Sequence, residues 1–217
     1  MTEIDWLRSM ILGSTKPAAV REWIEAQARA ETPLYDYRGD HVELVTATAL
    51  HLARREGGDE DIVMMAGWLH DIAKPGLGGS DDHGTEGAKR AAEILREAGV
   101  DEEQISAVQY AIRSHVGLVR DSPLDTLEAQ VLWEADKLVK LGVVGLLHFV
   151  LNGIRLQPGM TLSDMAARIR EYLPLAAKIA GSMQTETAKA MARERLAELK
   201  RISESLDREL SVLKEVQ

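Results

Sequence analysis

The segment from residue 126 to residue 151 constrains the fold of this chain more than any other. Its sequence, TLEAQVLWEADKLVKLGVVGLLHFVL, is rich in apolar side chains and predicts one long helix from about Leu127 to Leu151. The most apolar part, residues 138–151, is too short to span a bilayer and contains Lys140 and His148. We therefore expect a helix that is buried in the core of a globular protein.

Asp136 lies within this apolar helix, between Leu132 and Leu138. A buried carboxylate costs several kcal/mol, or changes its protonation state, unless it has a partner. A metal ion, an arginine, a lysine or the N-terminus of a helix would be such a partner. The position of Asp136 therefore indicates either a polar site inside the fold or a solvent-facing residue on the exposed side of the helix.

The rest of the chain predicts an all-α fold. Ala, Leu, Glu, Arg and Lys dominate the sequence, and alternating β-branched runs between turn signals are lacking. We expect Asp40 to cap one helix, Asp81 or Asp82 to cap another, and Pro75 to end a third. The helices predicted between these signals cover residues 2–12, 16–30, 41–56, 59–74, 83–99, 101–115, 127–151, 161–180 and 182–216, with a loop over residues 31–40.

The chain of 217 residues is long enough for one large domain with an appendage. The break NGIRLQPGM, residues 152–160, separates the segments rich in chemical groups from a polar helical region. We expect a main domain over residues 1–155 and a C-terminal helical extension over residues 156–217. The extension would form a lid or support self-association into a homo-oligomer.

Composition excludes several classes of function. The net charge of −9 makes a surface for nucleic acid polymers unlikely. Without cysteine the chain has no disulfide or thiolate metal site, so any metal must be held by histidines and carboxylates. The acidic N-terminus lacks the apolar core of a secretory signal, so we expect a cytoplasmic protein with no membrane span.

Histidine and aspartate residues recur at the ends of the predicted helices. In GWLHDIAKPG, residues 67–76, an apolar helix ends in a histidine followed by an aspartate. Taken singly, each histidine is ordinary on a helical surface or in a core, as we expect for His51 and His148. The set that lies where side chains from different helices can converge comprises His41, His70, Asp71, His83, His115 and Asp136.

This ordered set resembles the HD-domain superfamily of metal-dependent phosphohydrolases. The resemblance covers roughly residues 35–150 and rests on AGWLHDIAK, IRSH and TLEAQVLWEADKL. The last is similar to an Asp-Ala-Asp-Arg-Leu stretch in small bacterial members that act on nucleotides, with Glu134 and Lys137 in place of the first aspartate and the arginine. An all-α HD-type helical core, with ligands in a cleft between helices, is the fold that the resemblance implies.

The resemblance also implies a ligand set. In the superfamily, residues that match His41, His70, Asp71 and Asp136 hold one metal ion. His83 and His115 fall where members with two ions place further ligands, and Asp71 would then bridge both ions. Histidine with carboxylate suits Mn, Fe, Co, Ni or Zn and permits Mg.

Further residues are candidates for substrate binding and proton transfer. In family members with a similar His-Asp-Ile-Gly-Lys sequence the lysine meets substrate phosphate, which implies a catalytic, phosphate-binding role for Lys74. A solvated lysine at a helix C-terminus is the alternative. Arg38 and Arg113 are weaker phosphate-binding candidates, whereas Asp82 and Glu86 would orient ligand imidazoles or act as general bases.

The leading hypothesis is therefore a metal-dependent phosphohydrolase that acts on a small phosphorylated molecule, with a nucleotide as the favoured substrate. One or two divalent ions would polarise the phosphoryl group and activate water. The first alternative is a non-catalytic regulator that binds nucleotide or metal and uses residues 161–217 as a partner surface. The second is a di-iron oxygenase built on the same ligands.

Overall fold

The computed structural model describes residues 11, 20–25, 27–29, 35–74, 82–156 and 159–216 of the chain. The chain divides into two compact units, residues 1–36 and 37–217, and the second carries every candidate site residue. The predicted helix over residues 2–12 falls almost wholly outside the described residues, as do the predicted roles of Pro75 and Asp81. Within the predicted helix 16–30, residues 20–25 and 27–29 are helical.

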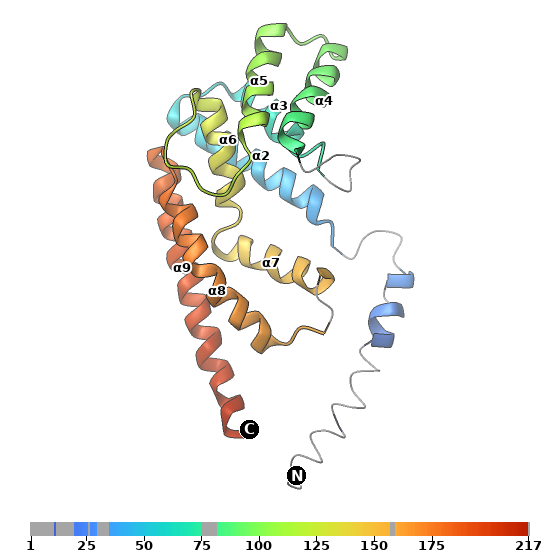
Figure 1. Cartoon of the computed structure of the whole chain (residues 1–217), viewed down its shortest axis with the longest axis vertical. Coiled ribbons are helices and arrows are strands. Elements are labelled where there is room, and N and C mark those ends of the chain that lie inside the picture. Colours follow the sequence, from blue (N-terminus) through green and yellow to red (C-terminus); the bar gives the residue numbers. More distant parts are fainter. Residues whose placement is uncertain are drawn as a thin grey trace. The chain divides into compact units, whose positions relative to one another are not determined.

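The described part of the second unit contains helices joined by loops and no strand, which confirms the all-α prediction (Figure 1). Asp59, Asp82, Asp101 and Thr126 each accept a backbone N–H at the start of a helix, which fixes where these helices begin. The helices are α2 (Tyr37–Glu56), α3 (Glu60–Leu69), α4 (His83–Glu97), α5 (Glu102–Ser114), α6 (Leu127–Leu138), α7 (Gly142–Leu156), α8 (Leu162–Gly181), α9 (Glu186–Leu210) and the 3₁₀ helix η1 (Ser211–Val216).

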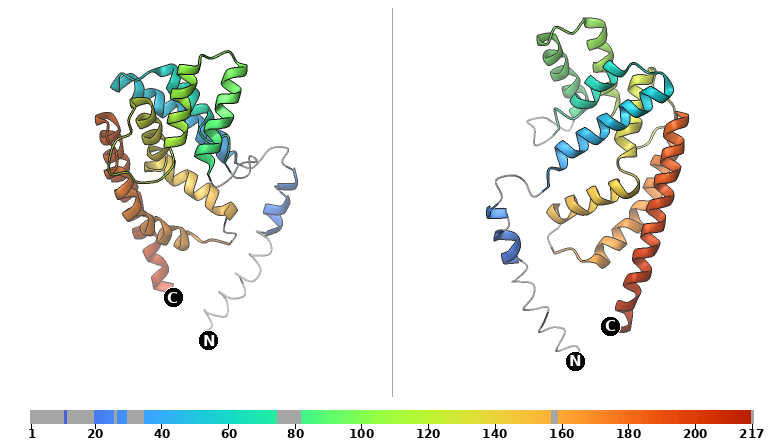
Figure 2. Two further views of the ribbon diagram at one scale, coloured as in Figure 1. Left: turned by 45° about the horizontal axis from the view of Figure 1, so that its top comes forward. Right: turned by 180° about the vertical axis from the view of Figure 1, so that it is seen from behind.

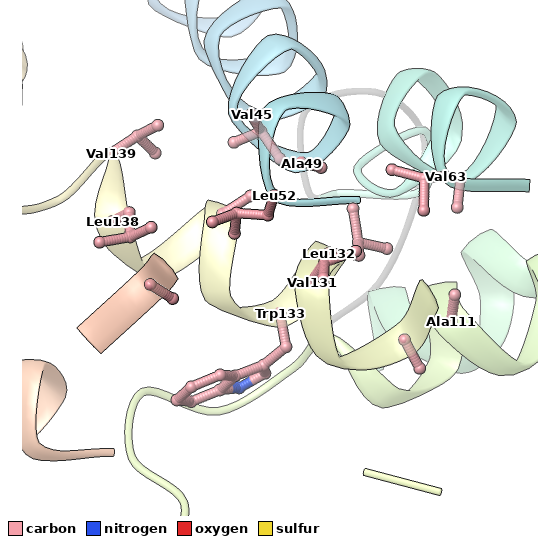
Figure 3. Close-up of a cluster of buried hydrophobic side chains, with 14 of the residues drawn as sticks. Val45, Ala49, Leu52, Val63, Ala111, Val131, Leu132, Trp133, Leu138 and Val139 are labelled. Carbon is pink, nitrogen blue, oxygen red and sulfur yellow. The ribbon is translucent and has the colours of Figure 1, made fainter. Parts of the chain in front are cut away.

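Helix α6 lies at the centre of the second unit. Every residue from Ala129 to Leu138 is buried, and the helix packs against α2, α3, α5 and α9. Figure 3 shows apolar side chains from α2, including Leu52, gathered on one side of α6 near Leu132. Trp133 points to the other side, where its indole N–H donates to the carbonyl of Gly117 at 3.2 Å.

Three predicted helix boundaries were wrong. The helix predicted over residues 59–74 ends at Leu69, so that residues 70–74 form turns after α3. Asp40 lies in the first turn of α2 rather than at its cap, because α2 begins at Tyr37, inside the predicted loop 31–40. The predicted helix 182–216 begins only at Glu186, after its cap Thr185, and tightens into η1 at its end.

The helix predicted over residues 127–151 is instead two helices, α6 and α7, bent by 62° at residues 139–141. Gly142 has φ +70°, a backbone conformation that glycine adopts readily and that breaks the helix. Gly145 then lies against the backbone of Lys140, where a Cβ atom would meet the carbonyl carbon at 2.3 Å. Both helices are apolar, so the apolar pattern of the sequence did not reveal the bend between them.

Helices α8 and α9 pack together and hold the C-terminal end of α6 (Figure 2). The carboxylate of Glu134 accepts from the backbone N–H groups of Gln184 and Thr185 at 2.5 and 2.9 Å, and from the Thr185 hydroxyl. Arg195 of α9 donates to the carbonyl of Leu138 at 2.7 Å. The C-terminal helices therefore fix the end of the central helix, while the division at residue 155 stays a prediction.

Among the described residues, no single helix is both long and apolar enough to cross a membrane. Helices α6 and α7 reach the required length and apolarity only as a bent pair. Residues Ala129–Leu138 of α6 are buried within the fold.

Replacing Gly145 with alanine should destabilise the fold. The added methyl group would overlap the Lys140 backbone, and such overpacking costs about 1–3 kcal/mol. Urea unfolding would measure the loss in the free energy of unfolding. The matched control is Gly181→Ala at the end of α8, where a Cβ atom meets nothing within 4 Å. Equal stabilities for the two variants would contradict the close approach at the bend.

Tyr172 of α8 should titrate at unusually high pH. Its hydroxyl donates to the carbonyl of Lys140 at 3.2 Å, and burial raises the pKa of Tyr172 to about 12. Because the folded pKa exceeds the unfolded value of about 10, the stability contributed by this phenol is complete below pH 10 and is lost as the pH rises toward 12. The difference in phenolate absorbance between the wild type and Tyr172→Phe should show a midpoint near 12, and a midpoint near 10 would contradict this burial.

Candidate metal centre

The candidate ligands come from the ends and the middle of five chain segments. His41 lies in the first turns of α2, His70 and Asp71 directly follow α3, and Asp136 lies in α6. His83 begins α4, and His115 follows α5. All of them except His83 are buried. The packing of these helices around α6 brings the predicted residues into one region of the second unit.

Asp71 is the centre of the arrangement. Its Oδ2 atom lies 3.4 Å from His41 Nε2 and 3.5 Å from His70 Nε2, and its Oδ1 atom lies 3.5 Å from His115 Nε2. Two groups of potential ligand atoms each lie within 4.8 Å of one another. The first group comprises His41, His70 and Asp71, and the second comprises Asp71, His83 and His115. Asp71 therefore belongs to both groups.

Backbone carbonyls orient two of the imidazoles. His70 Nδ1 is 2.7 Å from the carbonyl oxygen of Gly67, and His115 Nδ1 is 2.5 Å from that of Ile112. Since a carbonyl only accepts, Nδ1 carries the proton in each ring, and Nε2 of the neutral ring keeps its lone pair. Both Nε2 atoms face Asp71. A histidine that ligates a metal typically donates its other ring N–H to a carbonyl or carboxylate in this way.

Burial and charge set the protonation of these groups. Burial lowers the pKa of His70 to about 4, so its imidazole is neutral at physiological pH. Burial also acts on His41, but the carboxylates of Asp136 and Asp71 outweigh it and raise the pKa of His41. Burial would raise the pKa of Asp71, yet His115 and His41 together hold it below its ordinary value. Asp71 is therefore ionised.

Asp136 has two lysine partners that the sequence interpretation did not identify. Its Oδ2 accepts from Lys137, and its Oδ1 lies 2.5 Å from Lys140 Nζ and 3.3 Å from His41 Nε2. Burial would raise the pKa of Asp136, but Lys137 and Lys140 hold it well below its ordinary value. The i, i+4 spacing of Asp136 and Lys140 could have revealed one pair. Asp136 stands beside His41 but outside both groups of converging ligand atoms.

Lys137 is the most buried of these cations. Its ammonium also donates to the His115 carbonyl at 2.9 Å and lies 5.6 Å from the ring centre of Trp133. Burial lowers the pKa of Lys137 to about 8, although Asp136 opposes this effect. Lys137 therefore joins α6 to the end of α5, where His115 lies. From the sequence alone, Lys137 is only a lysine in the place of the arginine of similar proteins.

Of the other predicted residues, Lys74 contacts the cluster, whereas the rest have contacts elsewhere or are exposed. Lys74 Nζ lies 2.5 Å from Asp71 Oδ2, so this lysine is part of the cluster. Asp82 caps α4, and Glu86 pairs with Arg90. Arg38, Arg113 and His51 are all exposed.

His148, expected to be an ordinary core histidine, lies at the edge of the cluster. It is 8% exposed, and its Nε2 lies 2.8 Å from Asp40 Oδ2. Its ring is 6.5 Å from that of His41, and Tyr37 contacts both rings. His148 therefore links the start of α2 to α7, behind His41.

The cluster fits a divalent metal ion by its donor chemistry. Three of its buried polar atoms, His41 Nε2, His70 Nε2 and Asp71 Oδ1, make no hydrogen bond within the described part of the chain. Buried polar atoms of this kind normally have a partner, so these three require an explanation. Imidazole nitrogens and carboxylate oxygens without thiolates suit Mn, Fe, Co, Ni, Zn or Mg. The cluster could hold such an ion.

Comparison with known proteins agrees with this arrangement. Residues 38–141 match the family model of the HD domain. An HD-superfamily hydrolase from Bacillus thuringiensis is 26% identical over 79% of this chain and 85% of its own, with a TM-score of 0.61. A predicted HD superfamily hydrolase from an uncultured Thermotogales bacterium is 27% identical over 80% of each chain, with a TM-score of 0.54.

Bacillus subtilis YpgQ, solved in complex with ADP, is 22% identical over 78% of this chain and 87% of its own, with a TM-score of 0.60, and shares the fold. No curated protein matches the chain. Residues 38–141 therefore match the HD domain, and the helical core of the chain is similar to that of HD-superfamily hydrolases. This fold supports a metal-dependent hydrolase.

Removing the charge of Lys137 should destabilise the protein strongly. In Lys137→Met the buried carboxylate of Asp136 would lose one counterion, and breaking a buried ion pair costs about 3–5 kcal/mol. Chemical unfolding in the presence of a chelator would measure this loss. Lys189→Met is the matched control, because Lys189 pairs with Glu186 on the surface and such pairs contribute about 0–1 kcal/mol. Similar losses in the two variants would contradict the buried role of Lys137.

Proposed function

We propose that the protein is a metal-dependent phosphohydrolase that acts on a small phosphorylated molecule, with a nucleotide as the favoured substrate. The observation that carries the proposal is the convergence of two groups of ligand atoms on Asp71, with buried Nε2 and Oδ1 atoms that make no hydrogen bond. Phosphate ester hydrolysis requires neutralisation of phosphoryl charge and activation of water, and divalent ions supply both.

In this proposal His41, His70 and Asp71 hold one ion, and Asp71, His83 and His115 hold a second. Asp136 completes the first site from beside His41. The ions would polarise the phosphoryl group and lower the pKa of bound water. The carbonyls of Gly67 and Ile112 keep Nε2 of His70 and His115 directed at Asp71, so that these ligands need no rearrangement.

Lys74 is proposed to bind the substrate phosphate. Its ammonium lies on Asp71 Oδ2, and its side chain is 29% exposed, so it stands between the buried cluster and solvent. A lysine binds phosphate as a point charge on a flexible stem. Arg38 and Arg113, which are both exposed, remain weaker candidates for binding the phosphate.

The favoured substrate class follows from two supports. The segment around Asp136 is similar to that of small HD hydrolases that act on nucleotides, although Glu134 and Lys137 depart from it. YpgQ, which shares the fold, has been solved in complex with ADP. Both favour a nucleotide over other phosphorylated metabolites, and the acidic chain is unsuited to nucleic acid polymers.

Replacing Asp71 with asparagine should abolish hydrolysis and reduce the bound metal. The isosteric amide removes the anion that both ligand groups share. Elemental analysis after Mn loading should give up to two ions for the wild type and substantially fewer for Asp71→Asn. Turnover of nucleotides and simple phosphodiesters should fall by at least 100-fold. His115→Gln should lose the ion of the second group and keep the first.

Asp125→Asn is the matched control, because Asp125 contacts Tyr110 on the surface, outside the cluster. It should keep the metal content and the turnover of the wild type. Full activity in Asp71→Asn would refute the proposal. Nucleotide binding without turnover on any substrate would instead favour a non-catalytic regulator, and stoichiometric iron with oxygen-dependent turnover would favour an oxygenase.

A further inference from the structure

Two lysines reach the buried carboxylates from the solvent side of the cluster. Lys74 Nζ contacts Asp71 Oδ2, and Lys140 Nζ contacts Asp136 Oδ1, both at 2.5 Å. Their side chains are 29% and 30% exposed, whereas those of the two aspartates are 7% and 6% exposed. The pair therefore lies where the cluster meets solvent. Lys140 was not among the residues expected to bind substrate.

The two aspartate oxygens that accept from Lys74 and Lys140 both lie close to His41. His41 Nε2 lies 3.4 Å from Asp71 Oδ2 and 3.3 Å from Asp136 Oδ1, the same two oxygens that accept from the lysines. His41 Nε2 itself makes no hydrogen bond within the described residues. Each of the two lysines thus contacts one of the two carboxylates that are proposed to hold the first ion.

The backbone of Lys140 is held firmly, although its side chain extends toward solvent. Its carbonyl accepts from Tyr172 of α8, and Gly145 of α7 packs directly against its backbone. Lys140 Nζ also donates to the backbone carbonyl of Asp136 at 2.8 Å. A side chain with a fixed origin and a flexible stem can turn from the carboxylate to a nearby anion without moving a helix.

We propose that Lys140 is a substrate-binding residue that, together with Lys74, binds the phosphate of the substrate. The inference rests on the proposed function, because it requires a phosphorylated substrate. When Asp71 and Asp136 share their charge with a divalent ion, Lys74 and Lys140 need another anion, and like charges favour their turning outward. A phosphate bound at the metal lies within their reach. Lys137 cannot take this role, because its side chain is 3% exposed and stays on Asp136.

The test is the binding of imidodiphosphate, a pyrophosphate analogue whose nitrogen bridge resists hydrolysis, to the Mn-loaded protein. Isothermal titration calorimetry should show at least tenfold weaker binding for Lys140→Met than for the wild type, and an intermediate value for Lys140→Arg. Lys74→Met should weaken binding to a similar degree. Lys189→Met, which removes a distant surface lysine of α9, should bind as the wild type does.

Metal content and thermal melting separate binding from structure. Both should stay at wild-type values in Lys140→Arg and Lys140→Met, because the Lys140 side chain is 30% exposed and the buried Lys137 remains as the counterion of Asp136. Undiminished binding in Lys140→Met, or no binding of imidodiphosphate to the wild type, would overturn the inference. So would a loss of metal in Lys140→Met that Lys140→Arg restores. Lysine-dependent binding without turnover of any substrate would refute the proposed hydrolysis and leave the role of Lys140 intact.

Discussion

The burial of the Asp136 carboxylate on the central helix is the constraint on which the rest of the structure depends. Helix α6 is buried from Ala129 to Leu138, so the charge of Asp136 cannot be neutralised by water. Lys137, Lys140 and His41 surround it, and each belongs to a segment whose position then becomes fixed. The candidate site forms around this buried charge.

The C-terminal helices contribute to this region through the backbone of α6 and its end. Thr185 and Gln184 contact Glu134, Arg195 contacts the Leu138 carbonyl, and Tyr172 contacts the Lys140 carbonyl. None of these contacts reaches the candidate ligands. They fix the backbone from which the Lys140 side chain extends, so α8 and α9 would support the proposed role of Lys140 indirectly. A role for these helices in self-association or as a lid stays a prediction.

Much of the fold and of the candidate site could be predicted from the sequence, because the relevant signals are local. Asp82, one of two residues expected to cap the same helix, does cap α4, and the ordered histidines and aspartates indicated one cluster. The bend between α6 and α7 could not be predicted from apolar periodicity, since both helices are apolar and only the conformation of Gly142 separates them. A lysine was one of several partners expected for Asp136, but the sequence did not single out Lys137 and Lys140.

Other limits of prediction were matters of long-range packing. His148 lies 108 positions from Asp40 in the chain, yet the two side chains are in contact, and no local pattern announces such a pair. Arg38 and Arg113 lie close in sequence to candidate ligands, but helical geometry directs them to the surface. Their substrate-binding roles stay predictions, whereas His148, which was expected to be a core histidine, lies close to His41.

The lysines also bear on the order in which the protein folds and acquires metal. In many small metalloproteins the ligands repel one another or lack partners until an ion arrives, so folding waits for the metal. Here Lys74, Lys137 and Lys140 already balance the two central carboxylates. We therefore expect that repulsion between the Asp71 and Asp136 carboxylates does not prevent the chain from folding before an ion binds.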